Sequence, residues 1–210
     1  MTIDVGYISA AVITLLVTVD PLGLVPIFVG LTRNVPAASR QRAAKVAPLI
    51  AGLILIGALF GGHWLLGVLS ISLPAFRIAG GLLLFWIAVE MVFGKRMEEQ
   101  ARTAESAVEE QPQDIAAFPL AIPLIAGPGA ITAVILLAGR AEMNPLALFI
   151  SCVAIAVVML ACFASFSAAQ RIGALLGVTG TLVACRLLGL LLASLAVQYV
   201  VDGLRAAFLA

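Results

Sequence analysis

The sequence has little charge and few residues suited to metal or covalent chemistry. Asp, Glu, Lys and Arg make up only 11% of its 210 residues, whereas soluble domains average about 25%. It has one histidine and three cysteines without CxxC or Cys/His spacing, so neither a metal site nor a disulfide framework is expected. The cysteines are interpreted as small packing residues. A net charge of +1 gives no reason to expect nucleic acid as a partner.

Catalytic motifs are also missing. The chain contains no HExxH, GxSxG or Walker A sequence, so it is not expected to be an enzyme. No cofactor is implied, and any transport would need the gradient of the substrate or of an ion, with H+ and Na+ both left open. The N-terminus lacks the basic n-region of a cleavable signal peptide, so the first apolar segment is expected to remain in the protein.

Apolar residues, by contrast, make up 63% of the sequence. Runs long enough to cross a bilayer predict an all-α membrane protein with six transmembrane helices. The runs lie at approximately 8–31, 46–69, 74–93, 118–139, 145–168 and 178–201. Small-residue spacings such as Gly57 and Gly61 are expected to allow close helix packing, within the chain or in a homo-oligomer.

The charges between the spans predict an orientation. Residues 32–45 carry four basic residues and no acid, which places this loop in the cytoplasm by the positive-inside rule. The segment 94–117 falls on the same side, so both termini are expected outside a bacterial or archaeal inner membrane. Six of the eleven acids lie in 94–117, whose composition predicts a mobile, partly helical cytoplasmic linker.

That linker separates two halves, residues 1–93 and 118–210, with three predicted spans each. Two related halves with an odd number of spans must have opposite orientations, which is the inverted-repeat plan of many secondary transporters. An offset of 109 residues places Arg77 on Arg186. In such a plan, one three-span repeat is expected to move against the other.

The first span contains residues that interrupt a membrane helix. Asp20 there costs about 2.5–3.5 kcal/mol at mid-membrane, and proline removes a backbone donor that lipid cannot replace. Asp20 suits a helix N-cap and Pro21 the turn after it, so a half-helix is expected to begin here, with Gly23 in the same stretch. Asp20 is expected to accept a cation, a proton or a substrate ammonium group, with Thr18 beside it.

The fourth span is interrupted where the 109-residue offset predicts it. Gly127, Pro128 and Gly129 follow two other prolines, which predicts a second half-helix whose free N–H groups open near the midplane. The two half-helix ends are expected to form one pocket for substrate or ion, with Thr132 on its wall. Asp20 would then supply its only titratable charge.

Three further charged residues lie within the predicted spans. Arg186 is expected to face the protein interior and to pair with backbone carbonyls or a carboxylate, for which Asp20 is one candidate. Arg77 lies one turn into its span, so snorkelling to the interface and a gating or ion-pair role are alternatives. Glu90 is expected at the cytoplasmic interface, with the same gating or ion-pair alternative.

The two interrupted stretches together resemble a known family. The runs DPLGLVPIF, from Asp20, and PLIAGPGAIT, from Pro123, are similar to the paired signature of the MarC family of bacterial and archaeal inner-membrane proteins, and the resemblance covers essentially the whole chain. It implies a secondary transporter, because some relatives are described as transporters of small neutral amino acids such as glycine and alanine. The family is grouped with the LysE-type exporters, which implies export or exchange. Leu24 departs from the asparagine of many members.

Another class of function fits the same residues. An inner-membrane assembly or sensing protein would use 94–117 to signal and would transport nothing. An intramembrane enzyme is a more distant alternative. Flux of labelled alanine or glycine separates the transporter from the assembly or sensing protein.

Overall fold

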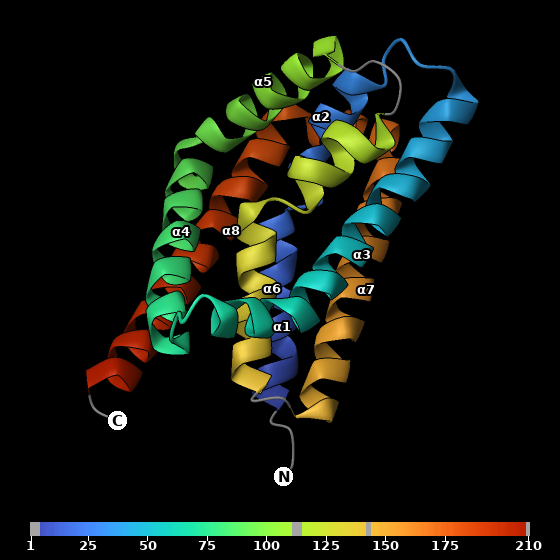
Figure 1. The fold of residues 1–210 in the computed structure, drawn as a ribbon. Coiled ribbons are helices and arrows are strands. Elements are labelled where there is room, and N and C mark those ends of the chain that lie inside the picture. The colour runs from blue at the N-terminus through green and yellow to red at the C-terminus, as the bar shows by residue number, and fades with distance from the viewer. Residues whose placement is uncertain (1–4, 111–114, 142–143, 209–210) are drawn as a thin grey trace.

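The computed structural model describes residues 5–110, 115–141 and 144–208, and every regular element in these ranges is helical. The elements are α1 (Val5–Val19), α2 (Leu24–Leu31), α3 (Ala37–Val68), α4 (Leu73–Phe93), α5 (Lys95–Glu110), η1 (Ala116–Ile125), α6 (Pro128–Ala141), α7 (Pro145–Ser167) and α8 (Ala169–Phe208). Figure 1 shows a bundle with α5 lying across one end. The predicted all-α membrane fold is confirmed.

Six spans fall where the apolar runs predict them. Four are long apolar helices: α3, α4, α7 and the part of α8 from Thr179 to Phe208. The first and fourth spans are bent pairs, in which α1 meets α2 at 41° and η1 meets α6 at 58°. The breaks therefore lie in the two spans that carry the proline and glycine motifs.

The segment η1 is irregular. Phe118 and Ile122 have extended backbone angles, with φ and ψ of −137° and 124° and of −127° and 127°. Each precedes a proline, which disfavours helical angles in the residue before it, and both of these X–Pro bonds are cis. Irregular backbone is tolerated at membrane depth only where protein covers it, and most apolar side chains of η1 are buried.

Corresponding spans of the two halves pack against each other. The most extensive packing is between α4 and α8, and α3 packs on α7 as α1 packs on α6. In Figure 1 the two members of each pair run in opposite directions, as two inverted three-helix repeats require. The α2–α3 turn and α5 lie at one end of the bundle, and α1 begins and α8 ends at the other.

Glycines allow α4 and α8 to approach closely. A Cβ at Gly81 would lie 2.8 Å from the carbonyl oxygen of Ala196, and one at Gly189 would lie 3.1 Å from the carbonyl oxygen of Ala88. Such small-residue contacts let the backbones of membrane helices pack tightly. The α4–α8 pair is therefore one packed unit built from both halves.

Gly57 and Gly61, which were expected to allow close helix packing, do not contact another helix within the described part of the chain. Nothing lies within 4 Å of a Cβ built at Gly57 or Gly61, and both residues are exposed on α3. Close packing there within the described part of the chain is therefore a wrong prediction. A contact between two copies of the chain stays a prediction.

The segment between the halves is partly helical, as predicted. Its first part forms α5, which packs on α2, α4 and η1. Met97, Ala101 and Ala104 recur at helical spacing on the inner face, and Ala104 is fully buried. The helix predicted for part of this segment is therefore confirmed over Lys95–Glu110, its mobility stays a prediction, and residues 111–114 lie outside the described residues.

Candidate functional site

Asp20 lies in the break of the first span, with 4% of its surface exposed. Its φ of 51° is in the left-handed region, which Asp adopts more readily than most residues. Its Oδ1 accepts a 3.1 Å hydrogen bond from the N–H of Gly23, and its carbonyl accepts a 3.2 Å bond from the N–H of Leu24. Asp20 thus bonds to the turn that leads into α2, whereas the N-cap position of α2 itself is Gly23 and not Asp20 as predicted. Pro21 lies in the intervening turn, because the regular helix α2 begins only at Leu24.

The other carboxylate oxygen of Asp20 meets α8. Sγ of Cys185 donates a 3.1 Å hydrogen bond to Oδ2, and Cys185 is 2% exposed. Gly23 leaves room for this contact, since a Cβ there would lie against the Asp20 carboxylate and 3.0 Å from Sγ of Cys185. Cys185 is therefore more than a packing residue, because it supplies a donor to a buried acceptor.

Arg186 does not take the position predicted for it. Its side chain is exposed, and the preceding residue, Cys185, faces Asp20 instead. Neighbouring residues on a helix point about 100° apart, so only one of the two can face the break. A Cβ at Gly94, where α4 ends, would lie 3.8 Å from Nη2 of Arg186. The prediction that Arg186 faces the interior is wrong.

Arg96, near the start of α5, supplies the positive charge beside Asp20. Its Nη2 donates a 2.6 Å hydrogen bond to the carbonyl oxygen of Thr18, in the last turn of α1, where carbonyls lack intrahelical partners. Although the side chain is partly exposed, Nη1 is buried without a partner among the described residues. Burial lowers the pKa of the Arg96 guanidinium, and Asp20 and Glu90 act in the opposite direction. Arginine stays charged in proteins, so a partly buried cation lies near a buried carboxylate.

The space around these groups is nearly filled. The cavity beside Asp20 measures about 10 Å³, at the lower limit of the roughly 10–15 Å³ that one water needs. It is lined by Asp20, Met91, Gly94, Arg96, Met97, Leu182 and Cys185. The site is therefore closed in this conformation, with one carboxylate, one guanidinium and apolar side chains on its wall.

The second break lies against the first. α6 begins at Pro128, and the N–H of Ile131 bonds to the carbonyl oxygen of Gly127 at 3.0 Å. Proline thus stands in the first position of the half-helix, where its missing N–H costs nothing. A Cβ at Gly129 would lie 3.2 Å from Cγ2 of Thr18, so the two interrupted segments are in contact.

The two breaks do not share the predicted pocket in this conformation. No residue of 127–129 lines the cavity at Asp20, whose other walls come from α4, α5 and α8. Thr18 bonds back to a carbonyl of its own helix at 2.6 Å, as threonines in helices commonly do. Thr132 faces Gly80 on α4. Neither threonine lines the Asp20 cavity.

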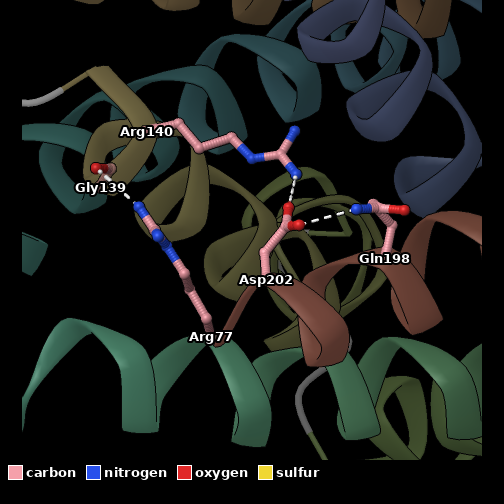
Figure 2. A network of polar contacts seen from close by, with 5 residues as sticks. All are labelled: Arg77, Gly139, Arg140, Gln198 and Asp202. Atoms are coloured by element: carbon pink, nitrogen blue, oxygen red, sulfur yellow. Dashed lines mark hydrogen bonds and ion pairs between the residues drawn. The ribbon is translucent and has the colours of Figure 1, made fainter. Parts of the chain in front are cut away.

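A polar network joins α4, α6 and α8 at the opposite end of the bundle (Figure 2). Arg140 and Asp202 form a 2.9 Å ion pair, the single one among the described residues, with side chains 27% and 30% exposed. Gln198 donates a 2.7 Å hydrogen bond to the other Asp202 oxygen. Nη2 of Arg77 donates a 3.3 Å bond to the carbonyl of Gly139, so Arg77 caps the end of α6, and it has no ion pair with any residue that the structure describes.

Aromatic and hydroxyl side chains adjoin this network. The guanidinium of Arg140 lies 4.4 Å from the ring centroid of Tyr199, a cation–π contact. The Tyr199 hydroxyl and Thr14 Oγ1 are both buried and interact, but neither has a partner with good hydrogen-bond geometry among the described residues. The Tyr7 hydroxyl donates to a carbonyl of α6 at 3.2 Å and shares a 2.9 Å bond with Ser151. This end of the bundle is therefore closed by polar contacts.

The sequence interpretation missed several of these residues. Arg96 comes two residues after Gly94, the left-handed C-cap of α4, whose φ is 76°. A glycine after an apolar run typically marks a helix end, so the sequence could have indicated that the chain turns here. Gln198 and Asp202 are four residues apart, the spacing of neighbours on one helix face. Cys185 left no signal, because its partner Asp20 is 165 residues away in the chain.

The whole chain is similar to membrane proteins of bacteria and archaea. A family model described as "MarC family integral membrane protein" matches residues 5–208. UPF0056 membrane protein YhcE of Escherichia coli (strain K12) is 37% identical over 196 residues, which cover 93% of this chain and 91% of that protein. A UPF0056 membrane protein of Archaeoglobus fulgidus is 38% identical over 206 residues (95% and 94%), and MJ1677 of Methanocaldococcus jannaschii is 35% identical over 209 (98% and 100%). No solved structure matches the chain.

Proposed function

This chain belongs to the MarC family of integral membrane proteins, and we propose that it is a secondary transporter of small neutral amino acids such as glycine and alanine. The direction is export or exchange. The names of its relatives record a membrane protein and no activity, so the proposal rests on the site.

One observation carries the proposal: a buried carboxylate stands in a helix break that contacts a second break in the other half of the chain. Asp20 is 4% exposed, and Thr18 beside it meets Gly129. Ionisable groups within a membrane are costly and typically mark substrate, ion or proton sites. Broken helices that meet between inverted halves form the binding sites of many secondary transporters.

The groups around the cavity fit a small zwitterion. Asp20 offers a carboxylate for an ammonium group, and Arg96 offers a guanidinium that binds carboxylates well. The other lining residues are apolar or glycine except for Cys185, so they leave no polar group for a charged substrate side chain. The cavity must enlarge to admit even glycine, which makes this conformation a closed one.

Alternating access requires the two ends to open in turn. Arg96 on α5 covers one side of Asp20, and the Arg140–Asp202 pair joins α6 to α8 at the other end. The close α4–α8 contact argues against motion of one whole half against the other. We assign the motion instead to α1, α2, η1 and α6 moving against the α4–α8 pair.

The same proposal includes an orientation in the inner membrane. The turn before α3 and the first turns of α3 carry four basic residues and no acid, which favours the cytoplasm for this end. The termini are then outside, and α5 covers the site from the cytoplasm. H+ and Na+ are the candidates for a coupling ion at Asp20.

The direct test is flux in proteoliposomes. Purified protein is expected to move labelled alanine or glycine, with a rate that changes when an H+ or Na+ gradient is imposed. Asp20→Asn keeps one oxygen for the Gly23 N–H bond, so it is expected to fold and insert while flux or its ion dependence is lost. Glu98→Gln, which removes an exposed carboxylate from α5, is the matched control and should leave flux unchanged.

Two outcomes would count against the proposal. Unchanged flux and ion dependence in Asp20→Asn would remove the coupling role of the carboxylate. Absence of flux for any small solute in well-folded protein would favour the assembly or sensing alternative, in which α5 passes a signal to the cytoplasm.

A further inference from the structure

A large basic cavity opens at the end of the bundle that holds the α2–α3 turn. Its volume is about 610 Å³, within the roughly 300–1,000 Å³ of ligand pockets. The walls come from α2, the turn after it, the start of α3, the end of α7 and the start of α8. Arg33, Arg40 and Lys45 line it, and no carboxylate does.

These three cations have no acidic partner in the described part of the chain, whose single ion pair is Arg140–Asp202. Arg33 and Lys45 are exposed, and Arg40 is half-buried. Among the other lining residues, the rings of Phe28 and Phe166 stack with centroids 4.6 Å apart and an interplanar angle of 7°. The cavity thus combines a stacked pair of aromatic rings with three positive charges that have no acidic partner among the side chains that the structure describes.

A second hollow continues from the first along the membrane-spanning surface. It measures about 360 Å³, lies between α3 and α7, and shares Lys45 and Phe163 with the basic cavity. Apart from Lys45, its lining is apolar or glycine, and includes the exposed Leu49 and Leu53. An apolar groove therefore runs along two spans and ends at a cluster of cations.

We infer that the two hollows together form a binding site for one anionic phospholipid. The phosphate of the headgroup lies among Arg33, Arg40 and Lys45, and an acyl chain lies in the groove between α3 and α7. Basic pockets between transmembrane helices recognise anionic headgroups in this way. A free phosphate would use only the cations and would leave the apolar groove without a role, so the occupant is a lipid.

The headgroup half of the site is tested by native mass spectrometry of the full chain in detergent with added phosphatidylglycerol. The wild type is expected to retain this lipid and to bind phosphatidylcholine at least about tenfold more weakly. The triple variant Arg33→Gln, Arg40→Gln, Lys45→Gln should lose the preference. Arg42→Gln, Arg102→Gln, Arg171→Gln removes three exposed cations that do not line the cavity, and should keep it.

The acyl-chain half is tested in the groove. Ala156→Phe fills the groove from an exposed position and is expected to weaken phosphatidylglycerol binding severalfold, whereas Val157→Phe places the same phenyl ring at an exposed position outside the lining and should leave binding unchanged. Equal binding of phosphatidylglycerol and phosphatidylcholine would overturn the inference. So would equal affinity for the water-soluble headgroup glycerophosphoglycerol and for the lipid, or equal effects of the two triple variants.

Discussion

Each charge at the break of the first span lies at a helix end that favours its sign. The Asp20 carboxylate is at the start of the turn leading into α2, and the Arg96 guanidinium is at the end of α1. Helix N-termini stabilise anions and C-termini stabilise cations. Ends of broken helices within a membrane expose N–H and C=O groups that lipid cannot satisfy. The same two residues thus stabilise the helix break and supply the two charged groups of the candidate site.

Gly23 is predicted to be intolerant of any side chain. In Gly23→Ala the new Cβ would press on the Asp20 carboxylate and on Sγ of Cys185. We expect a loss of about 1–3 kcal/mol in the free energy of unfolding, as for an overpacked core. Thermal unfolding in detergent, followed by circular dichroism, measures it.

Gly30→Ala is the matched control on the same helix. Nothing lies within 4 Å of a Cβ at Gly30, so alanine there should be neutral or should stabilise α2 by about 0.5–1 kcal/mol. Equal losses at the two positions would contradict the close contact described for Gly23.

Arg96→Gln is predicted to weaken the contact of α5 with the break in the first span, and so to expose Asp20 and Cys185 more often. The Thr18 carbonyl loses a 2.6 Å charge-assisted hydrogen bond, at a cost of about 1–3 kcal/mol. We expect a severalfold faster reaction of Cys185 with a small maleimide, measured by peptide mass spectrometry. Arg102→Gln, at an exposed position on the same helix, should leave the rate unchanged, and a faster reaction there would remove the special role of Arg96.

The part of the site that is local in sequence could be predicted. The bonds of Asp20 to its own turn follow from Asp and Pro side by side, and these are present. Contacts across the fold could not be predicted, because the orientation of α8 decides whether residue 185 or 186 faces the break. That choice depends on packing against α1 and α4, and nothing near Arg186 in the sequence indicates it.

At the scale of elements, the prolines and glycines in the sequence correctly predicted which two spans are broken. Their effect is local, since proline removes a backbone donor and restricts the residue before it. The packing of α5 against the bundle was not predicted. Its many charges obscure a narrow apolar stripe of Met97, Ala101 and Ala104. Composition describes the exposed face of such a helix, whereas the buried face determines where it packs.

The connection between α6 and α8 is predicted to be weak but specific. Because the side chains of Arg140 and Asp202 are 27% and 30% exposed, their coupling should be about 0.2–1 kcal/mol. A double-mutant cycle with Arg140→Gln and Asp202→Asn measures it from unfolding free energies. The coupling should shrink in 1 M salt, and no coupling at low salt would show that the pair does not hold this end closed.

At the scale of the whole molecule, the halves interlock. Each span of one half packs on its counterpart in the other, and the tightest contact, between α4 and α8, takes one member from each. The opposite directions of the halves were predicted from an odd number of spans per half. The pairing of counterparts was not, because it depends on the shapes of helix surfaces.

The orientation gives a prediction for the whole chain. A cysteine in place of Ser106, exposed on α5, should react with a membrane-impermeant maleimide only after the membrane is opened. A cysteine in place of Arg205, exposed near the end of α8, should react in intact cells. Wild-type labelling is subtracted as background. The reverse pattern would invert the proposed topology.

The contacts of Asp20 also become available at different times during synthesis of the chain. The carboxylate leaves the ribosome with the first span, whereas Cys185 follows 165 residues later, about 10–30 s at roughly 5–20 residues per second. Arg96 is synthesised before Cys185, so the carboxylate first has its own turn, then the guanidinium and last the thiol as neighbours. A nascent chain that stops before α8 is therefore expected to hold Asp20 with one hydrogen-bond donor fewer than the complete chain.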